Sequence, residues 1–154
     1  LSSVREFKLA IEAIKSFNKP YLVGAHISEG VRLPSGEKIS DIISKIEHNN
    51  LLGLILSCIS PENYEENLDE IKNLGLPFGF KLNGFVTTKP TSGYTNSFKK
   101  SKTGNPNEFL GKRKDLTPKN MAVIVKKFKD AGATILGGCC ETRPGHIREM
   151  AKLR

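Results

Sequence analysis

The stretch ATILGGCC, residues 133–140, places two cysteines directly behind a short apolar run. Its first half is typical of a buried strand, which Gly137 and Gly138 then end. Successive side chains of a strand point to opposite faces, so Cys139 and Cys140 converge on one point only where the backbone leaves strand geometry. We expect the two glycines to supply that conformational freedom.

The remaining cysteine occupies the same kind of position behind another apolar run. Cys58 follows LLGLILS, residues 51–57, so all three cysteines of the chain stand at the ends of predicted strands. Three protein ligands with an open fourth position are common at catalytic zinc sites. For Cys58 alone, a small buried hydrophobe is the alternative interpretation. The adjacent pair favours a metal site, because a disulfide between neighbouring cysteines fits disulfide geometry badly.

Length and cysteine usage indicate an ordinary globular chain. Its 154 residues fit one domain or part of a larger one. It lacks both the apolar run of about 18 residues that a membrane-spanning helix needs and the residue order of a signal peptide. It does not begin with Met, so we expect it to start partway through a gene.

The cysteine count indicates the compartment. An odd number of cysteines without a secretory segment favours a reducing compartment. We therefore predict a soluble, cytoplasmic protein without membrane contact.

The net charge of +8 is concentrated in one stretch of the chain. Residues 89–114 hold seven basic residues and one acidic residue. Thr, Ser, Gly, Asn and Pro make up much of the rest, which is typical of an exposed loop. We favour a solvated basic loop, an insertion at about residues 86–115, over a nucleic-acid surface, because no motif spacing of a nucleic-acid-binding fold accompanies the charge.

Apolar periodicity and capping signals predict helices and strands in strict alternation. Ser60-Pro61 and Thr117-Pro118 mark two helix starts, each with a cap residue and a proline in the first turn. Alternation of helices with buried strands predicts parallel βαβ units, as in doubly wound sheets and TIM barrels. Helices are expected over residues 4–17, 39–48, 60–74 and 119–131 and from residue 142, and strands over residues 21–27, 51–58, 76–83 and 133–138.

The location of the chemically active side chains favours the barrel. Cys58, Asn83 and Cys139 each end a predicted strand, as do His26 and Ser28. In a TIM barrel these strand ends meet on one face, where the active sites lie. A complete (β/α)₈ barrel typically needs about 250 residues. The fold class is therefore α/β, and we expect residues 1–154 to form the C-terminal half of a (β/α)₈ TIM barrel with parallel strands alternating with helices.

Several stretches of the chain resemble one family in the correct order. Residues 137–147 resemble the GGCC motif of the zinc-dependent homocysteine S-methyltransferases, which include betaine–homocysteine methyltransferases and the homocysteine-binding module of methionine synthase. Ser57-Cys58 resembles the family's Asn-Cys ligand, and residues 78–85 resemble its Asn-rich turn. Residues 33–37 and 113–118 resemble two further family segments.

The resemblance implies an enzyme that methylates homocysteine and forms methionine. It implies Cys58, Cys139 and Cys140 as ligands of a zinc ion, through which they take part in catalysis. The metal would deprotonate the homocysteine thiol, which takes a methyl group from a sulfonium, quaternary ammonium or folate-type donor. Asn83 and His26 are candidate substrate-binding residues, with a structural hydrogen bond as the alternative for His26.

The chain departs from the family pattern at three positions. Ser57 replaces the usual Asn, Glu141 replaces a small Gly beside the predicted ligands, and Gly145 replaces a common acid. His146 is expected to cap or pack the terminal helix. The family's first four strands are absent, so the alternative function is a truncated, inactive zinc-binding half-barrel that acts as a structural or interaction module. The missing N-terminal half-barrel or a second copy of the chain is then a candidate partner, because open sheet edges associate.

Overall fold

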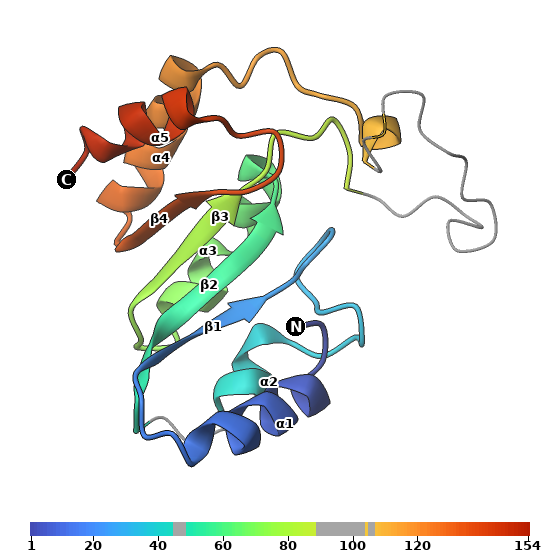
Figure 1. Ribbon diagram of the computed structural model, residues 1–154, viewed down its shortest axis with the longest axis vertical. Helices are drawn as coiled ribbons and strands as arrows, with labels where there is room; N and C mark the ends of the chain where they lie inside the picture. Colours follow the sequence, from blue (N-terminus) through green and yellow to red (C-terminus); the bar gives the residue numbers. More distant parts are fainter. Residues whose placement is uncertain (45–48, 89–103, 105–106) are drawn as a thin grey trace.

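The computed structural model describes residues 1–44, 49–88, 104 and 107–154. Helices and strands alternate along the chain, as the sequence predicts (Figure 1). In chain order the elements are α1 (Val4–Lys15), β1 (Tyr21–Ala25), α2 (Ile39–Ile43), β2 (Leu51–Ile59), α3 (Pro61–Lys72), β3 (Phe78–Leu82), the 3₁₀ helix η1 (Glu108–Leu110), α4 (Pro118–Asp130), β4 (Ile135–Gly138) and α5 (Pro144–Ala151).

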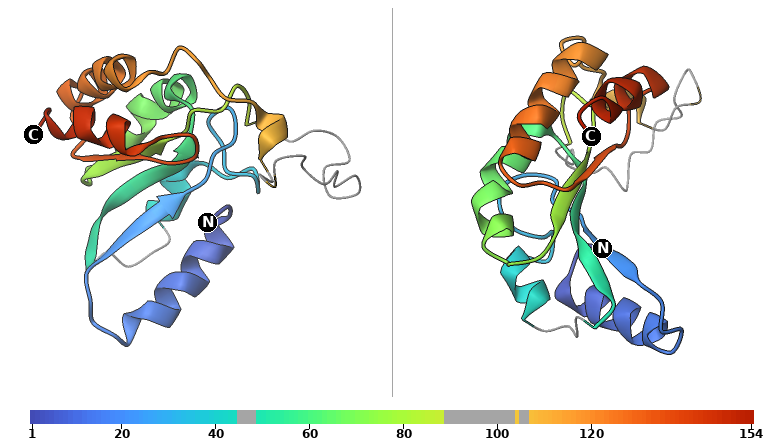
Figure 2. Two further views of the ribbon diagram at one scale, coloured as in Figure 1. Left: turned by 45° about the horizontal axis from the view of Figure 1, so that its top comes forward. Right: turned by 90° about the vertical axis from the view of Figure 1, so that its left-hand side faces the viewer.

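The strands form one parallel sheet of four strands, in which they are neighbours in chain order, β1-β2-β3-β4. A doubly wound sheet reverses its strand order partway, whereas a (β/α) barrel places each strand beside the previous one. The observed order therefore confirms the predicted α/β class, with parallel strands alternating with helices. Figure 2 shows α2, α3 and α4 along one face of the sheet, with α1 and α5 at its two ends, beside β1 and β4.

The two faces of the sheet have different environments. On the helix-covered face, Leu54, Leu56 and Phe80 are completely buried. On the opposite face, Leu22 is 47% exposed and Lys81 is exposed as well. The core therefore lies between the sheet and its helices, and the other face is the one that lines the interior of a closed barrel.

Three aromatic rings pack against one another between the sheet and two of its helices. Tyr64 of α3 lies edge-on to Phe80 of β3 and to Phe128 of α4, with ring centroids 4.8 and 4.7 Å apart, and Phe80 and Phe128 are 5.7 Å apart. Such edge-to-face pairs contribute about 0.5–1.5 kcal/mol beyond their buried area. This cluster holds α3 and α4 against β3.

The two capped helix starts at Ser60 and Thr117 are confirmed, whereas the last helix begins at Pro144 instead of residue 142, and several other element bounds differ by one to three residues. Ser60 and Thr117 each accept a hydrogen bond from a backbone amide in the first turn of their helix, ahead of a proline. The first helix ends at Lys15 instead of residue 17, because Phe17 closes a tight turn and Asn18 adopts a φ of +45°. The second helix is described as far as Ile43, and residues 45–48 lie outside the described residues.

Much of the predicted basic loop, residues 89–103 and 105–106, lies outside the described residues. Phe85 and Lys112, at the two described ends of this loop, form an isolated antiparallel bridge. The two ends therefore lie side by side beyond β3.

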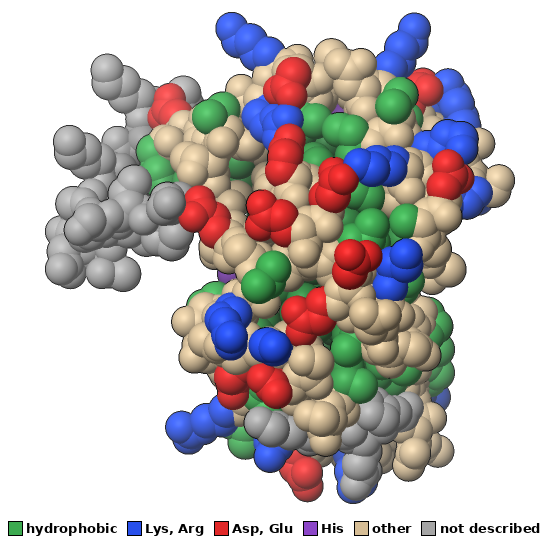
Figure 3. All heavy atoms as spheres, turned by 180° about the vertical axis from the view of Figure 1, so that it is seen from behind, with side chains coloured by type: hydrophobic (Ala, Val, Ile, Leu, Met, Phe, Trp, Pro, Cys, Tyr) green, Lys and Arg blue, Asp and Glu red, His purple; other side chains and the backbone are tan. Residues whose placement is uncertain are grey.

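On the face shown in Figure 3, acidic and basic side chains are intermixed. Within the described residues, none of the helices has the length and apolar character needed to cross a membrane.

Candidate metal centre

The three cysteines of the chain converge at the C-terminal edge of the sheet. Their Sγ atoms all lie within 4.8 Å of one another, with 3.7 Å between Cys58 and Cys140 and 4.0 Å between Cys139 and Cys140. Tetrahedral zinc with Zn–S bonds of about 2.3 Å places its sulfur ligands about 3.8 Å apart. The spacing and the thiol chemistry of the cluster therefore fit a three-thiolate metal site.

Cys58 reaches this cluster because β2 contains a bulge at its C-terminal end. Ser57 pairs with Lys81 and Ile59 pairs with Leu82, so Cys58 is an extra residue without a partner on β3. Its φ of +57° lies in the left-handed region, which residues other than glycine rarely adopt. In an unbroken strand, alternation would point Cys58 toward the helix-covered face. The bulge re-aims the thiol toward the other two sulfur atoms.

Backbone hydrogen bonds hold the adjacent cysteine pair against β3 and the turn that follows it. The Cys139 amide donates to the Leu82 carbonyl at 2.7 Å, and the Gly84 amide donates to the Cys140 carbonyl at 2.9 Å. The Thr142 hydroxyl donates to the Cys139 carbonyl at 2.6 Å. These contacts order the turn after β4, so that both thiols of the pair face the end of β2.

Close contacts, and not unusual dihedral angles, favour glycine at the two positions before the pair. Neither Gly137 nor Gly138 is among the described residues with positive φ, which corrects the expectation that they release the backbone from strand geometry. A Cβ at Gly138 would lie 2.9 Å from the Cβ of Thr142, and one at Gly137 would lie 3.2 Å from the Phe80 carbonyl oxygen. Small residues therefore let the turn fold back onto the strand.

The three thiols of the cluster differ in the direction of their pKa shifts: the pKa of Cys139 is lowered, and those of Cys58 and Cys140 are raised. Hydrogen bonding from Cys58 is the main cause that lowers the pKa of Cys139 to about 5, and the positive charge of Lys81 lowers it further. The same interaction with Cys139, together with burial, raises the pKa of Cys58 above its usual range. Burial is the first cause that raises the pKa of Cys140. The lowered pKa makes Cys139 the most readily deprotonated thiol of the cluster.

The two candidate substrate-binding residues lie at the end of β1 and just after β3, next to the Cys58 segment. The His26 Nδ1 lies 3.2 Å from the Ser57 carbonyl oxygen, and its Nε2 lies 3.0 Å from the Ser28 hydroxyl. Asn83 is completely buried, and its Nδ2 donates to the Cys58 carbonyl at 2.7 Å. Both side chains therefore contact the backbone that carries one of the cysteines.

Glu141, which directly follows the cysteine pair, occupies a position where glycine is favoured. Its φ is +61°, in the left-handed region that glycine adopts without a steric penalty. Its carboxylate lies 3.8 Å from the Lys112 Nζ and 3.5 Å from an Arg143 guanidinium nitrogen. The carboxylate is thus directed to neighbouring cations, and its side chain is 15% exposed.

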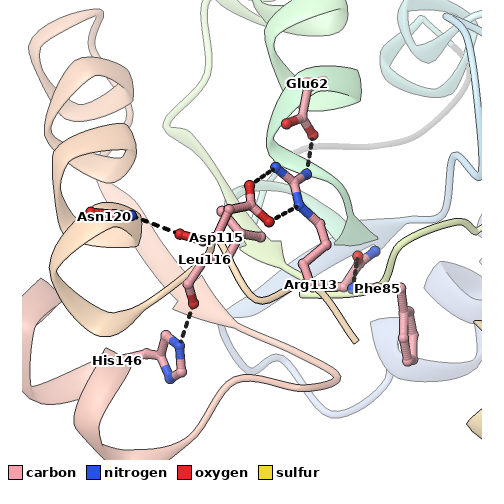
Figure 4. Close-up of polar contacts among 8 residues, drawn as sticks. Glu62, Phe85, Arg113, Asp115, Leu116, Asn120 and His146 are labelled. Carbon is pink, nitrogen blue, oxygen red and sulfur yellow. Dashed lines mark hydrogen bonds and ion pairs between the residues drawn. The ribbon is translucent and has the colours of Figure 1, made fainter. Parts of the chain in front are cut away.

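His146 has the structural role that its sequence position predicts. The Arg143 amide donates to the His146 Nδ1 at 2.9 Å, which caps α5. The opposite nitrogen, Nε2, then donates to the Leu116 carbonyl at 2.9 Å, so the buried ring ties α5 to the segment before α4. Figure 4 shows the ring directed at Leu116.

Arg113, Glu62 and Asp115 form an ion-pair network beside the site that the sequence did not predict. Figure 4 shows the Arg113 guanidinium between two carboxylates, 2.7 Å from Glu62 and 2.6 Å from Asp115. Its backbone amide donates to Gly84, the residue that binds the Cys140 carbonyl. Hydrogen bonds from Arg113 lower the pKa of Glu62 and of Asp115. Arg113 thereby fastens the segment before α4 to the start of α3.

A cavity of about 340 Å³ opens beside this network. Residues that follow β1, β2 and β3 line it, among them Ser28, Ser60, Phe85 and Thr88, together with Arg113. The Thr88 hydroxyl donates to the Ser28 carbonyl at 2.7 Å, which joins two of these segments. The cavity therefore lies on the same edge of the sheet as the cysteines, although no cysteine lines it.

Comparisons with known proteins identify a family for the chain and agree with its fold. A family model described as homocysteine S-methyltransferase matches residues 1–154. Homocysteine S-methyltransferase 2 of Arabidopsis thaliana is 30% identical over 125 residues, which are 80% of this chain and 33% of that protein. Homocysteine S-methyltransferase 1 of Saccharomyces cerevisiae is 28% identical over 140 residues, 87% of this chain and 39% of that protein.

A solved structure has the same fold as the chain. The homocysteine methyltransferase MmuM from Escherichia coli, in its oxidized form, superposes with a TM-score of 0.68 at 19% identity, over 99% of this chain and 42% of that chain. The α/β arrangement and the matched family model together define the class of protein. This chain belongs to the homocysteine S-methyltransferase family. It spans between 33% and 42% of the length of the three relatives described above.

Proposed function

We propose that this chain provides the metal-binding part of a homocysteine S-methyltransferase, in which Cys58, Cys139 and Cys140 hold a zinc ion. The observation that carries the proposal is the convergence of three thiols within 4.8 Å in a chain of this family. Soft thiolate ligands suit zinc better than magnesium or calcium. The relatives are named for homocysteine, which we propose as the methyl acceptor.

Bound zinc would lower the pKa of a thiol placed at its fourth position, so that the thiol reacts as a nucleophile at neutral pH. The three cysteines of this chain would hold the ion and leave one side of it open toward the barrel interior. In the reaction a new sulfur–methyl bond forms, the donor's bond to the methyl group breaks, and its electron pair stays with the donor. The thiol proton goes to water.

The chain's other residues would order the site in this proposal. Gly84 and Leu82 hold the cysteine pair through its backbone, and Arg113 holds the segment that contains this contact. The methyl donor belongs to the sulfonium, quaternary ammonium or folate class, and it would approach from the open face of the sheet. Three free thiols are also in keeping with a reducing compartment, and we propose the cytoplasm as the location.

Methionine formation tests the proposal directly. The reduced, zinc-loaded protein is incubated with homocysteine and, in turn, with S-methylmethionine, S-adenosylmethionine, betaine and methyltetrahydrofolate. We expect one donor to give methionine, and we expect Cys139→Ser and Cys140→Ser to abolish it while the fold is retained. The assay is made both on this chain and on any longer product of its gene. Methionine formation that persists unchanged in Cys139→Ser would refute the proposed role.

A second candidate function follows from the open sheet. The edge strands β1 and β4 each have one neighbour within the described sheet, and Leu22 on its uncovered face is 47% exposed. A sheet of this kind associates with a further structure. The chain would then be an inactive zinc-binding half-barrel that pairs with another half-barrel or with a second copy. Zinc binding without methionine formation by the chain or by a longer gene product would favour this function.

A further inference from the structure

His26 and Asn83 both direct a nitrogen atom at the backbone that carries Cys58. The His26 Nδ1 lies 3.2 Å from the Ser57 carbonyl oxygen, and the Asn83 Nδ2 donates to the Cys58 carbonyl at 2.7 Å. These two carbonyl groups are consecutive in the chain and lie at the bulge of β2. One side chain comes from the end of β1 and the other from the turn after β3, so the bulge is held from both neighbouring strands.

The bulge needs such support because two of its features are unfavourable in isolation. Cys58 has no partner on β3, since the pairing passes from Ser57 directly to Ile59. Its φ of +57° is a left-handed conformation that persists only where the surroundings determine it. If the bulge relaxed into a regular strand, the Cys58 side chain would turn toward the helix-covered face. The position of this thiol therefore depends on contacts to the bulge.

Asn83 is fixed in the orientation that supplies one of these contacts. The residue is completely buried, and its backbone amide donates to the Ile59 carbonyl at 2.9 Å. Its side-chain oxygen accepts a hydrogen bond from the Phe85 amide at 3.1 Å. With the oxygen used in this way, the nitrogen end of the amide faces Cys58. A carboxylate of the same shape would place an acceptor against an acceptor.

The tautomer of His26 follows from its two contacts. A carbonyl oxygen only accepts, so Nδ1 carries the proton and donates to Ser57. The Nε2 of the neutral ring then accepts from the Ser28 hydroxyl, 3.0 Å away. Ser28 thus keeps the donor nitrogen of the ring directed at the bulge.

We propose that His26 and Asn83 are positioning residues, which hold the Cys58 bulge and so aim its thiol at Cys139 and Cys140. They act through the backbone of Cys58 and do not bind the metal themselves. The metal of this proposal is the thiolate-bound zinc ion. The inference rests on the proposed function for its ligand. Removal of a comparable outer contact of a metal ligand weakens metal binding by about 10-fold to 100-fold.

Cobalt(II), a spectroscopic substitute for zinc, measures the role of Asn83. Asn83→Asp removes the donor at constant shape, and we expect cobalt(II) affinity at least about 10-fold below wild type with an altered thiolate charge-transfer band. Asn67→Asp is the matched control. Asn67 is also completely buried, and its Nδ2 donates to two other carbonyls, at 2.8 Å to Gly30 and 2.7 Å to Asn63. The control is expected to keep the wild-type affinity and spectrum.

A pair of variants tests His26 in the same way. His26→Leu removes the donor and is expected to weaken cobalt(II) binding, while His26→Asn restores a nitrogen near the Nδ1 position and is expected to recover most of the affinity. Because His26 is only half-buried, these variants should fold even if Asn83→Asp does not. The inference is overturned if Asn83→Asp and His26→Leu both fold and bind cobalt(II) with the wild-type affinity and spectrum.

A metal-free measurement separates this inference from the proposed function. In a Cys139→Ser background, dibromobimane joins Cys58 to Cys140, whose Sγ atoms are 3.7 Å apart, and fluoresces after cross-linking. We expect this product in the parent, and a several-fold lower yield after His26→Leu or Asn83→Asp. If the wild-type chain takes up no cobalt(II), the proposed function fails and the cross-linking yield alone decides the positioning role. An unchanged yield then overturns it.

Discussion

The Sγ atoms of Cys58 and Cys140 lie 3.7 Å apart, although 82 residues separate the two cysteines in the chain. Their strands are not adjacent, because β3 lies between β2 and β4 in the sheet. The contact requires that both strands end at one edge of a parallel sheet, that β2 contain a bulge, and that the turn after β4 fold back. The thiol cluster is therefore a product of the tertiary fold and should be lost on unfolding.

Glu141→Gly should stabilise the chain. The φ of +61° at this residue is unfavourable for any side chain and suits glycine, and the two ion pairs that the change removes, at 3.5 and 3.8 Å, are long. We expect a gain of about 1 kcal/mol, which for a chain of this size raises the Tm by about 2–4 °C. Thermal unfolding followed by circular dichroism checks this value.

Glu141→Ala is the matched control for that gain. Alanine removes the carboxylate but keeps the Cβ at a φ of +61°. We expect no stabilisation from this variant, because the backbone conformation stays unfavourable. An equal rise in Tm for both variants would instead attribute the effect to the charge, and the backbone explanation would be wrong.

Tyr64→Phe should leave the chain at least as stable as wild type. The Tyr64 hydroxyl is buried in the aromatic cluster and has no hydrogen-bond partner in the described structure. A buried polar group without a partner costs about 1–3 kcal/mol, so its removal should increase the free energy of unfolding. Tyr64→Ala should lose about 3–5 kcal/mol through the cavity it leaves. Urea unfolding compares the variants, and a marked loss of stability in Tyr64→Phe would reveal a partner for the hydroxyl.

Arg113→Ala should reduce the sensitivity of the chain to acid. Arg113 lowers the pKa of Glu62 and Asp115 below their ordinary values of 4.5 and 3.8. A lowered carboxyl pKa stabilises the fold above the ordinary value, and this stabilisation is lost as the pH falls through the lowered value. The wild-type chain should therefore lose more stability than Arg113→Ala between about pH 6 and pH 2.

Urea midpoints measured across that range test the role of Arg113. Arg113→Lys keeps the charge without the fork that reaches both carboxylates, and we expect an intermediate acid dependence. Identical pH profiles for wild type and Arg113→Ala would show that the network does not couple folding to the protonation of Glu62 and Asp115.

The reactivity of the thiols in the metal-free chain should differ from one cysteine to another. The pKa of Cys139 is lowered to about 5, while those of Cys58 and Cys140 are raised. Because the thiolate is the nucleophile, iodoacetamide at about pH 7 should modify Cys139 first. Peptide mass spectrometry after short reaction times measures this order. In denaturant the three rates should become similar, and similar rates in the folded chain would contradict the separation.

The sequence predicts the fold well where the signals are local. Apolar strands and the capped starts at Ser60 and Thr117 depend on a few neighbouring residues, and they are found as expected. Several element ends differ from the predicted ends, because contacts outside the local pattern set them. The turn at Phe17 and Asn18, for example, shortens α1 against its apolar periodicity.

Local sequence patterns predict the positions of the three cysteines, but they do not predict the contacts that arrange the site. Each cysteine stands directly after an apolar run, and parallel strands bring such ends to one edge. The bulge at Cys58 and the contacts of His26 and Asn83 with its carbonyl groups depend on registers between strands, which no local pattern reports. The pairing of Arg113 with Glu62 spans 51 residues and gave no local signal either.

Zinc content of the reduced chain tests the central claim most directly. The protein is purified without added metal, loaded with zinc, freed of excess by gel filtration and analysed by mass spectrometry of the elements. We expect about one zinc per chain, and loss of the metal in Cys58→Ser, Cys139→Ser and Cys140→Ser, since a catalytic site needs three protein ligands. Wild-type chain that retains no zinc under reducing conditions, or variants that retain it fully, would contradict the three-thiolate site.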